Sequence, residues 1–267
     1  MAVWFVTGAA RGIGHRVARE ALRRGHRVVA TGRDLTAVTD TFAGAAGEVL
    51  PLELEVSRPE TASAAVERAL RRFGRIDVLV HGAHRTARGP LDETTEARIK
   101  ELFEVNVAGM LAVTSAVLPV LSAQRTGRII VVGSAAGFSA PAGAGPYSAS
   151  MAAVEALCET LRAELAETGV HVTVVELGRF ATLPTPFDRS PHPPEDPRKA
   201  AAAIVDLLVT DDPPLRLQLG ADAVAHVEAK LERVAQELDL WRPVSLGTGF
   251  EPEDFNRQNG HRPSPDM

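Results

Sequence analysis

A glycine-rich turn near the start of the chain constrains the fold more than any other feature. An apolar run, Val3-Trp4-Phe5-Val6, breaks into Thr7-Gly8-Ala9-Ala10-Arg11-Gly12-Ile13-Gly14, and a helix-like apolar pattern follows. The order strand, glycine turn, helix is the geometry that holds a diphosphate at a helix N-terminus. Gly8 permits the tight turn, Gly12 lets backbone N–H groups approach phosphate oxygens, and Gly14 lets the helix pack close to the strand. We therefore predict that a dinucleotide is bound by Gly8, Ala10, Arg11, Gly12, Ile13 and Gly14.

The rest of the chain alternates between strand-like and helix-like patterns. Strands are expected at 27–31, 49–56, 76–80, 128–132, 170–176 and 215–219, and helices at 57–73, 96–124, 147–168, 199–208 and 222–240. Ser57 is expected to cap the first of these helices and Gly127 to end the second. The alternation predicts one α/β domain over residues 1–240, a Rossmann-like doubly wound parallel sheet in three layers. Residues 183–200, rich in proline, are expected to form a substrate lid, and residues 241–267 a C-terminal tail.

Composition limits the partners of the chain. Its 267 residues are 45% hydrophobic, which is enough for a large core, and a net charge of −5 argues against nucleic acid as a partner. No apolar run approaches the ~20 residues of a membrane span, and the first strand begins at once. We therefore predict no membrane partner, no signal peptide and a cytoplasmic location. A single cysteine, Cys158, excludes an internal disulfide and is expected in the core or an interface, and no metal site is predicted.

Ligands of a parallel sheet bind at the carboxyl ends of its strands, so the residues there form one rim. Arg33 follows the second strand, where a base accepts the 2′-phosphate of NADP and an acid binds the 2′-hydroxyl of NAD. Arg33 and Arg11 together favour NADP(H), although the neighbouring Asp34 is such an acid and Arg33 could be a solvated loop charge. Glu55 follows the third strand, where an adenine could lie. The other rim residues expected at the cofactor are His81, Gly82, Ala83, Gly178 and Thr182.

Two hydroxyl side chains on the rim have the chemistry of a carbonyl reductase. Ser134 stands thirteen residues before Tyr147, with a Gly/Ala/Pro-rich connection between them. A tyrosine hydroxyl can act as general acid to a ketone oxygen that a serine hydroxyl holds. With an ordinary pKa of ~10, the tyrosine needs help at neutral pH, and a nearby cation is the usual help. Asn106 lies inside a predicted helix, where asparagine is unfavourable, so a specific partner is expected for its side chain.

These motifs make the chain resemble the classical short-chain dehydrogenases/reductases over essentially residues 2–240. Thr7–Gly14 matches the family's TGxxxGIG, Asn106 its structural and catalytic asparagine, and Ser134 and Tyr147 its serine and tyrosine. The resemblance implies that Tyr147 donates a proton, Ser134 orients the carbonyl, Asn106 anchors a proton-relay water and NADPH supplies the hydride. It also implies a homodimer or homotetramer, built through the helices that contain Asn106 and Tyr147.

Three departures from the family pattern all fall at the nicotinamide end of the rim. The family's YxxxK is Tyr147-Ser148-Ala149-Ser150-Met151, so an apolar side chain stands where a lysine would bond the nicotinamide ribose and lower the tyrosine pKa. By position Met151 remains an expected cofactor contact. The family's NNAG is His81-Gly82-Ala83-His84, and its Pro-Gly is Leu177-Gly178.

No basic residue is a clear stand-in for the missing lysine. Lys100, Lys199 and Lys230 lie elsewhere by the predicted topology, and Arg179, just past the sixth strand, is the nearest basic candidate. His81 or His84 could supply a titratable group, or each could be a plain loop residue.

Three functions therefore stay open. The first is an NADPH-dependent carbonyl reductase with an atypical mechanism, acting on a small hydrophobic molecule such as a polyketide-like secondary metabolite; it rests on the glycine motif with Asn106, Ser134 and Tyr147. The second is a non-redox cyclase, dehydratase or lyase, motivated by the joint loss of the lysine and of NNAG. The third is a catalytically dead dinucleotide-binding subunit that pairs with an active relative.

Overall fold

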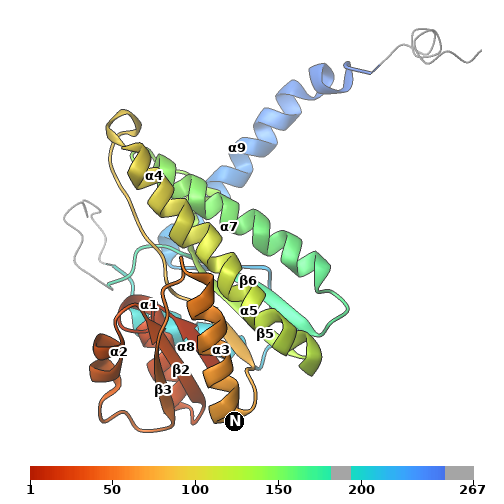
Figure 1. Ribbon diagram of the computed structural model, residues 1–267. Helices are drawn as coiled ribbons and strands as arrows, with labels where there is room; N and C mark the ends of the chain where they lie inside the picture. The colour runs from red at the N-terminus through yellow and green to blue at the C-terminus, as the bar shows by residue number, and fades with distance from the viewer. Residues whose placement is uncertain (182–193, 250–267) are drawn as a thin grey trace, which may run out of the picture. The chain divides into compact units, whose positions relative to one another are not determined.

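A parallel sheet lies between two layers of helices (Figure 1). The computed structural model describes residues 1–181 and 194–249. Within these residues, seven strands run parallel in the order β3-β2-β1-β4-β5-β6-β7. The strands are β1 (Val3–Thr7), β2 (Arg27–Gly32), β3 (Val49–Glu53), β4 (Val78–His81), β5 (Gly127–Ser134), β6 (Val170–Leu177) and β7 (Arg216–Leu219). The predicted Rossmann-like doubly wound sheet is confirmed, and its strand order reverses direction between β1 and β4, where such sheets bind their ligands.

Helices cover both faces of this sheet. The core on one face contains side chains from α1 (Gly12–Arg23), α2 (Leu35–Phe42) and α8 (Pro197–Asp206). The core on the other face contains side chains from α3 (Pro59–Phe73), α5 (Gly109–Gln124) and α7 (Gly145–Glu164). The other helical segments are η1 (Leu91–Glu93), α4 (Glu96–Phe103), the π-helical turn η2 (Glu104–Ala108), α6 (Ala135–Phe138) and α9 (Ala221–Leu246). Every residue of β1 and β4 is buried, as expected for central strands covered on both faces.

The chain divides into two units, residues 1–227 and residues 228–267. The first unit holds the whole sheet and all of the candidate site residues that the structure describes. The boundary falls inside α9, which continues to Leu246 and so passes the end at Leu240 that the pattern predicted. The division into a domain of residues 1–240 and a tail stays a prediction.

Several predicted helix boundaries are wrong, each for a local reason. Helix α3 begins at Pro59 rather than under a Ser57 cap, because proline at the first helical position needs no N–H partner. Ser57 Oγ instead donates a hydrogen bond to Glu55 Oε1 at 3.2 Å. Helix α5 ends at Gln124, where the C-cap residue Arg125 adopts a left-handed conformation with φ 53°, and Gly127 belongs to β5.

Three further segments differ from the prediction. Helix α7 runs from Gly145 to Glu164, so it begins two residues earlier and ends four residues earlier than the predicted helix at 147–168. Helix α8 begins at Pro197, capped by the Asp196 side chain, so the last residues of the predicted 183–200 lid are helical, while residues 182–193 lie outside the described residues. Helix α2 was not predicted at all; the Asp34 side chain caps it by accepting a hydrogen bond from Ala37 N at 3.1 Å.

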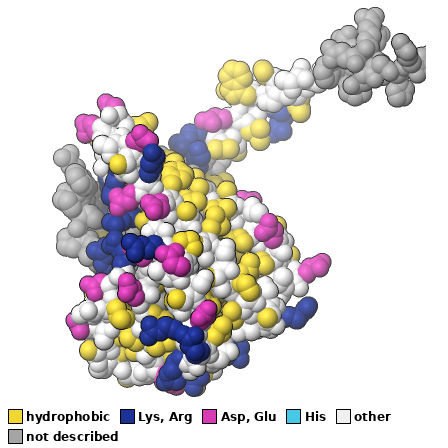
Figure 2. Space-filling view, viewed as in Figure 1, with side chains coloured by type: hydrophobic (Ala, Val, Ile, Leu, Met, Phe, Trp, Pro, Cys, Tyr) yellow, Lys and Arg dark blue, Asp and Glu magenta, His cyan; other side chains and the backbone are white. Residues whose placement is uncertain are grey.

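The described helical segment Glu96–Gln124 is long and apolar. By length and composition alone it is the one described helix that could cross a membrane, with a mean hydropathy of 1.8. Polar residues interrupt the segment, so it holds no unbroken apolar run of the ~20 residues that a membrane span needs. Its mean hydropathy is nevertheless high enough for a span. Met110, Val113, Val117 and Leu121 are buried against the sheet, which accounts for part of this apolar character. Figure 2 shows further apolar side chains over α5 and α7 on the face in view.

Candidate active site

The turn between β1 and α1 leaves open space for a phosphate. Gly8 and Gly12 both have φ of +65°, a conformation that favours glycine. A Cβ on Gly8 would lie 2.7 Å from Ala83 N, and a Cβ on Gly14 would lie 2.7 Å from the Gly8 carbonyl oxygen. A Cβ on Gly12 would meet no atom within 4 Å. Two of the glycines therefore permit close backbone packing, and the third lies on the open side of the turn, where the helix N-terminus can receive an anion.

Thr7 joins this turn to the end of β4. Its buried hydroxyl accepts hydrogen bonds from Gly82 N at 3.1 Å and Ala83 N at 3.2 Å. A Cβ on Gly82 would lie 2.6 Å from the Thr7 carbonyl oxygen. The segment His81–His84, which replaces the family's NNAG, therefore keeps a glycine where the ends of β1 and β4 touch. Sequence reasoning did not assign Thr7 a role; its position directly before Gly8 was the only signal.

His81, the last residue of β4, and His84, in the loop that follows, differ in their surroundings. His81 is buried, and its Nε2 lies 2.9 Å from Thr114 Oγ1 on α5. Burial lowers the pKa of His81 to about 3, so its ring is neutral and directed into the helix layer rather than the rim. His81 therefore has the surroundings of a core residue, and its roles as a titratable group and as a cofactor contact stay predictions. His84 lies on the exposed rim, where partial desolvation and the nearby Arg11 charge lower the pKa of its ring.

The ends of β2 and β3 carry the charges expected at the adenosine ribose. The Arg33 side chain is 54% exposed, and its Nε lies 3.7 Å from Glu55 Oε2, which makes a loose ion pair. Arg11, at the N-cap position of α1, is also exposed. Asp34, the acid that could bind a 2′-hydroxyl, uses Oδ1 to cap α2. Two guanidinium groups are therefore accessible at these strand ends, and one carboxylate oxygen of Asp34 is engaged in the cap of α2.

Asn106 lies in the π-helical turn η2, where its side chain has the specific partners that its position predicted. Its Nδ2 donates to the Arg85 carbonyl oxygen at 3.0 Å and to Ser150 Oγ at 2.9 Å, and its Oδ1 accepts from Arg85 N at 2.7 Å. Ser150 Oγ in turn donates to the Tyr147 carbonyl oxygen at 2.8 Å. The buried amide therefore holds the loop after β4 and the first turns of α7 together.

Ser134 and Tyr147 come together at the end of β5. Ser134 is the last residue of that strand, and its Oγ accepts a hydrogen bond from Ala136 N at 3.2 Å. Tyr147 is half-buried in the first turn of α7. Desolvation raises the pKa of the Tyr147 hydroxyl above its ordinary value, while a hydrogen bond with Ser134 and the charge of Arg88 act in the opposite direction. Ser134 therefore lies close enough to the Tyr147 hydroxyl to lower its pKa, and the phenol is protonated at neutral pH because desolvation has the larger effect.

Met151 is a core residue, one turn along α7 from Tyr147. It is 3% exposed and belongs to the apolar core on the α3, α5 and α7 face. A Cβ on Gly137 of α6 would lie 2.9 Å from Met151 Cβ, which shows how closely the two helices pack. Packing accounts for this methionine, and its role as a cofactor contact stays a prediction.

The loop after β4 brings a cation to Tyr147. Gly89 N donates a hydrogen bond to the Gly143 carbonyl oxygen at 2.9 Å, and a Cβ on Gly145 would lie 3.5 Å from Leu91 Cδ1. These contacts hold the loop against the start of α7. Arg88, next to Gly89, is exposed, and its charge lowers the pKa of Tyr147. No sequence signal marked Arg88, because its approach depends on how two loops far apart in the sequence meet.

The end of β6 is organised by an aspartate that sequence reasoning also missed. Asp222 Oδ2 accepts a hydrogen bond from Arg179 N at 2.9 Å, and a Cβ on Gly178 would collide with the same carboxylate. The requirement for glycine at position 178 therefore comes from Asp222. Beyond it, Phe180, which precedes the predicted lid, forms a parallel bridge with Glu195 within it. Thr182, a predicted cofactor contact, lies outside the described residues.

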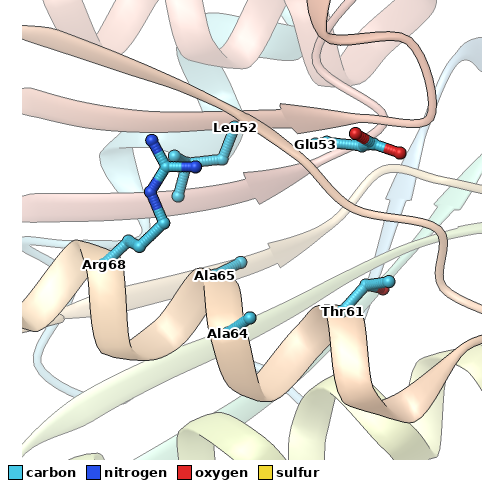
Figure 3. A pocket seen from close by; sticks show the side chains of 6 residues that line it. All are labelled: Leu52, Glu53, Thr61, Ala64, Ala65 and Arg68. Atoms are coloured by element: carbon cyan, nitrogen blue, oxygen red, sulfur yellow. The ribbon is translucent and has the colours of Figure 1, made fainter.

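A small cavity lies elsewhere, between β3 and α3 (Figure 3). It has a volume of about 220 Å³ and is lined by Leu52, Glu53, Thr61, Ala64, Ala65 and Arg68. Glu53 and Arg68 are its only charged lining residues, and no residue of the candidate active site lines it. We assign it no part in the chemistry.

Comparison with known proteins agrees with this geometry. The family described as short chain dehydrogenase matches residues 2–189. An oxidoreductase from Botryotinia fuckeliana, BOA17, is 29% identical over 92% of this chain and 98% of its own length. An uncharacterised oxidoreductase from Staphylococcus saprophyticus is 34% identical over 75% of this chain and 88% of its own length.

Solved structures of similar fold include dehydrogenases. A short-chain dehydrogenase from Streptomyces avermitilis has a TM-score of 0.87 and 37% sequence identity, covering 93% of this chain and 98% of its own. An alcohol dehydrogenase from Thermococcus sibiricus, complexed with 5-hydroxy-NADP, has a TM-score of 0.73 and 26% identity, covering 82% of this chain and 96% of its own.

Proposed function

Because the chain belongs to the short-chain dehydrogenase family and is an oxidoreductase of that type, we propose that it uses NADPH to reduce a carbonyl on a hydrophobic, polyketide-like substrate. The observation that carries the proposal is the placement of Ser134 at the end of β5 beside Tyr147 in the first turn of α7, close enough for Ser134 to act on the Tyr147 pKa. This pair lies at the carboxyl edge of the same sheet whose β1–α1 turn forms an anion cradle. We also propose a cytoplasmic location and no nucleic-acid or membrane partner.

The residues present fit NADP(H). Gly12 offers open space at the helix N-terminus for the diphosphate, and Arg11 and Arg33 are accessible to a 2′-phosphate. A related alcohol dehydrogenase was solved with 5-hydroxy-NADP, which supports the same choice here. When bound, the reduced cofactor supplies the hydride.

Tyr147 and Ser134 provide the proton and the orientation of the carbonyl. Burial keeps the Tyr147 hydroxyl protonated, which is the form that a reductase needs at the start of the reaction. Tyr147 donates this proton to the carbonyl oxygen, and the Ser134 hydroxyl holds that oxygen by a hydrogen bond. Asn106 maintains the geometry by fixing Ser150 and, through it, the first turns of α7.

Arg88 takes over the electrostatic role of the missing lysine in this mechanism. Proton donation leaves a tyrosinate in a partly desolvated site, and a nearby positive charge stabilises that anion. Met151 on α7 has no charge, whereas Arg88 is held near Tyr147 by the Gly89–Gly143 hydrogen bond. The cation therefore comes from the loop after β4 instead of from the helix that carries the tyrosine.

Copies of the chain associate through α4–α5 and α7 in this proposal, as a homodimer or homotetramer. Part of the Glu96–Gln124 segment remains outside the core although it is apolar. Figure 2 shows apolar side chains gathered over α5 and α7. Burial of this surface between copies would remove it from water.

The test is consumption of NADPH by the purified protein with a panel of apolar ketones, combined with identification of the alcohol product. We expect NADPH oxidation equal in amount to the alcohol formed, and a strong preference for NADPH over NADH. Normal NADPH binding without oxidation on any ketone of a broad panel would reject the reductase.

A non-redox reaction is the second candidate, because Met151 is buried in the core and leaves α7 without the cation of the family motif. Tyr147 and Ser134 would then do acid–base work in a cyclisation, dehydration or lyase reaction. Product formation without any nicotinamide cofactor would favour it. Strict dependence on NADPH, with stoichiometric oxidation, would exclude it.

A further inference from the structure

Helix α9 carries much of the exposed apolar surface of the described chain. Leu231, Val234, Leu238 and Trp241 are between 43% and 59% exposed. Val224, earlier on the same helix, is 42% exposed. Figure 2 shows apolar side chains along this helix. Large apolar side chains gathered on one helix usually mark a surface that another molecule covers.

These five exposed residues, together with the half-buried Val227, follow a heptad pattern. Val224, Val227, Leu231, Val234, Leu238 and Trp241 are separated alternately by three and four residues, the spacing of a and d positions in a coiled coil. We call these six residues the α9 seam. An average spacing of 3.5 residues keeps one stripe of a helix facing a partner helix along its length. Because α9 is continuous from Ala221 to Leu246, the whole seam lies on one helix.

The charges beside the seam favour a second copy of the same helix. In a parallel pair, each g position faces the e position five residues later on the partner. Glu237 then faces Arg242 of the other copy, and by symmetry the same attraction occurs twice. Lys230 faces Ala235, and Ala223, at the g position before Val224, is buried within its own copy, so no like charges meet. An antiparallel pair with Leu231 opposite Val234 would place Lys230 against Lys230, which is unfavourable.

We infer that the α9 seam binds the α9 seam of a second copy of this chain, in parallel and in register. The pairing is isologous, since each copy offers the same surface to the other. It is separate from the association through α5 and α7 proposed above, and it does not depend on the proposed reaction. The seam is short for a coiled coil, so it adds to another contact between copies instead of replacing it.

Two neighbouring leucines provide a matched test in the full-length protein. Leu238 lies in the seam, and Leu240 lies on another face of the same helix and is 75% exposed. Both are exposed, so Leu238→Glu and Leu240→Glu should leave the fold intact, which circular dichroism checks. We expect Leu238→Glu to raise the concentration of half-association, measured by sedimentation, at least tenfold, and Leu240→Glu to leave it unchanged. Equal behaviour of the two variants, or a wild type that stays monomeric, would overturn the inference.

Cysteine cross-linking tests the register. The only native cysteine, Cys158, is buried and should give no background. In a parallel pair, position 234 of one copy meets position 234 of the other, so Val234→Cys should form a disulfide-linked dimer quickly under mild oxidation. Leu240→Cys should not. Cross-linking at equal rates, or no cross-link at position 234, would contradict the pairing.

Discussion

The buried amide of Asn106 donates a hydrogen bond of 2.9 Å to Ser150 Oγ, which itself donates one of 2.8 Å to the Tyr147 carbonyl oxygen. The position of the proposed proton donor therefore depends on a side chain from a different helix. Asn106 also bonds both backbone groups of Arg85, which begins the segment leading to Arg88. One amide thus supports the tyrosine and the loop that brings a cation to it.

Replacing Asn106 should destabilise the protein as well as the site. Asn106→Leu has a similar size but removes the partners of the Arg85 backbone groups and one of the two hydrogen bonds of Ser150 Oγ. Each unsatisfied buried group costs about 1–3 kcal/mol, so we expect a loss of roughly 2–4 kcal/mol in the free energy of unfolding by urea. Ser150→Ala, which removes only the serine part of the network, should cost less. A change within about 0.5 kcal/mol for Asn106→Leu would contradict the clamp.

Cofactor choice should depend on Arg33. Arg33→Ser removes a charge from the 2′-phosphate, so we expect NADPH affinity, measured by fluorescence titration, to fall about tenfold or more while NADH affinity changes little. Glu55→Gln should have the opposite effect on NADPH, because it releases Arg33 from its ion pair. Asp34→Ala is the control: it should cost about 1 kcal/mol of stability through loss of the α2 cap and leave the cofactor preference unchanged. Equal losses for NADH and NADPH in Arg33→Ser would refute this assignment.

The glycine turn, the alternation of strands and helices, and the pair of Ser134 and Tyr147 could be predicted because their signals are local. A strand followed by Gly8, Gly12 and Gly14 has few other solutions, and buried parallel strands are apolar on both faces. Helix ends are harder to predict, because the backbone conformation of one residue can decide them. Pro59 decides the start of α3 in this way, and Arg125 the end of α5. Helix α2 was missed because it is short and its start depends on one capping aspartate.

The rest of the site could not be predicted because it depends on tertiary contacts. The inward orientation of His81 is set by Thr114 on α5, thirty-three positions along the chain. The charge of Arg88 acts on Tyr147 from a loop that the Gly89–Gly143 hydrogen bond holds against the start of α7. In the same way, the glycine at position 178 could be noted from the sequence, but the Asp222 carboxylate that requires it could not.

The stability of the protein should fall as the pH rises from about 4.5 to about 7, because of a buried carboxylate pair. Desolvation and the neighbouring charge of Glu176 raise the pKa of Glu155 to about 7, although Arg216 Nε lies 2.9 Å from it. A carboxyl whose pKa is raised on folding holds its proton in the folded state while the unfolded state has lost it. The folded state therefore binds more protons between about pH 4.5 and pH 7, and the free energy of unfolding decreases across that window.

Glu155→Gln should remove this pH dependence and raise stability at pH 8 relative to the wild type. Glu159→Gln is the matched control, because Glu159 bonds the same Arg216 but is 65% exposed. Urea unfolding at pH 5, 6, 7 and 8 measures the slope for each variant. An unchanged slope in Glu155→Gln would show that another group is responsible.

Tyr147 is the only tyrosine of the chain, so its ionisation can be followed directly by absorbance at 295 nm. We expect a pKa above the ordinary tyrosine value in the wild type, and a still higher one in Arg88→Gln, because a stabilising charge is lost. Arg88→Lys should restore the wild-type value. Arg85→Gln, which breaks an ion pair with Glu101 at 3.1 Å, is the control and should have a smaller effect. An identical Tyr147 pKa in wild type and Arg88→Gln would remove Arg88 from the mechanism.

The substitution Met151→Lys tests whether the lysine of the family's YxxxK motif can still function at this position. The new ammonium should lower the Tyr147 pKa and raise reductase activity, at some cost in stability because Met151 is 3% exposed and lies in the core. Met151→Leu controls for altered packing and should change neither the pKa nor the activity by much. Loss of a native activity in Met151→Lys, with the fold intact, would mean that the site has been rebuilt for different chemistry.

The central claim is that hydride moves from the nicotinamide to a carbonyl while Tyr147 supplies the proton. The most direct measurement uses NADPH deuterated at the transferred C4 position, with mass spectrometry of the product, in the wild type and in Tyr147→Phe. We expect one deuterium on the new carbinol carbon, and a kcat at least about 100-fold lower in Tyr147→Phe with unchanged NADPH affinity. Product without deuterium, or product formed at the same rate without nicotinamide or without the Tyr147 hydroxyl, would contradict the account.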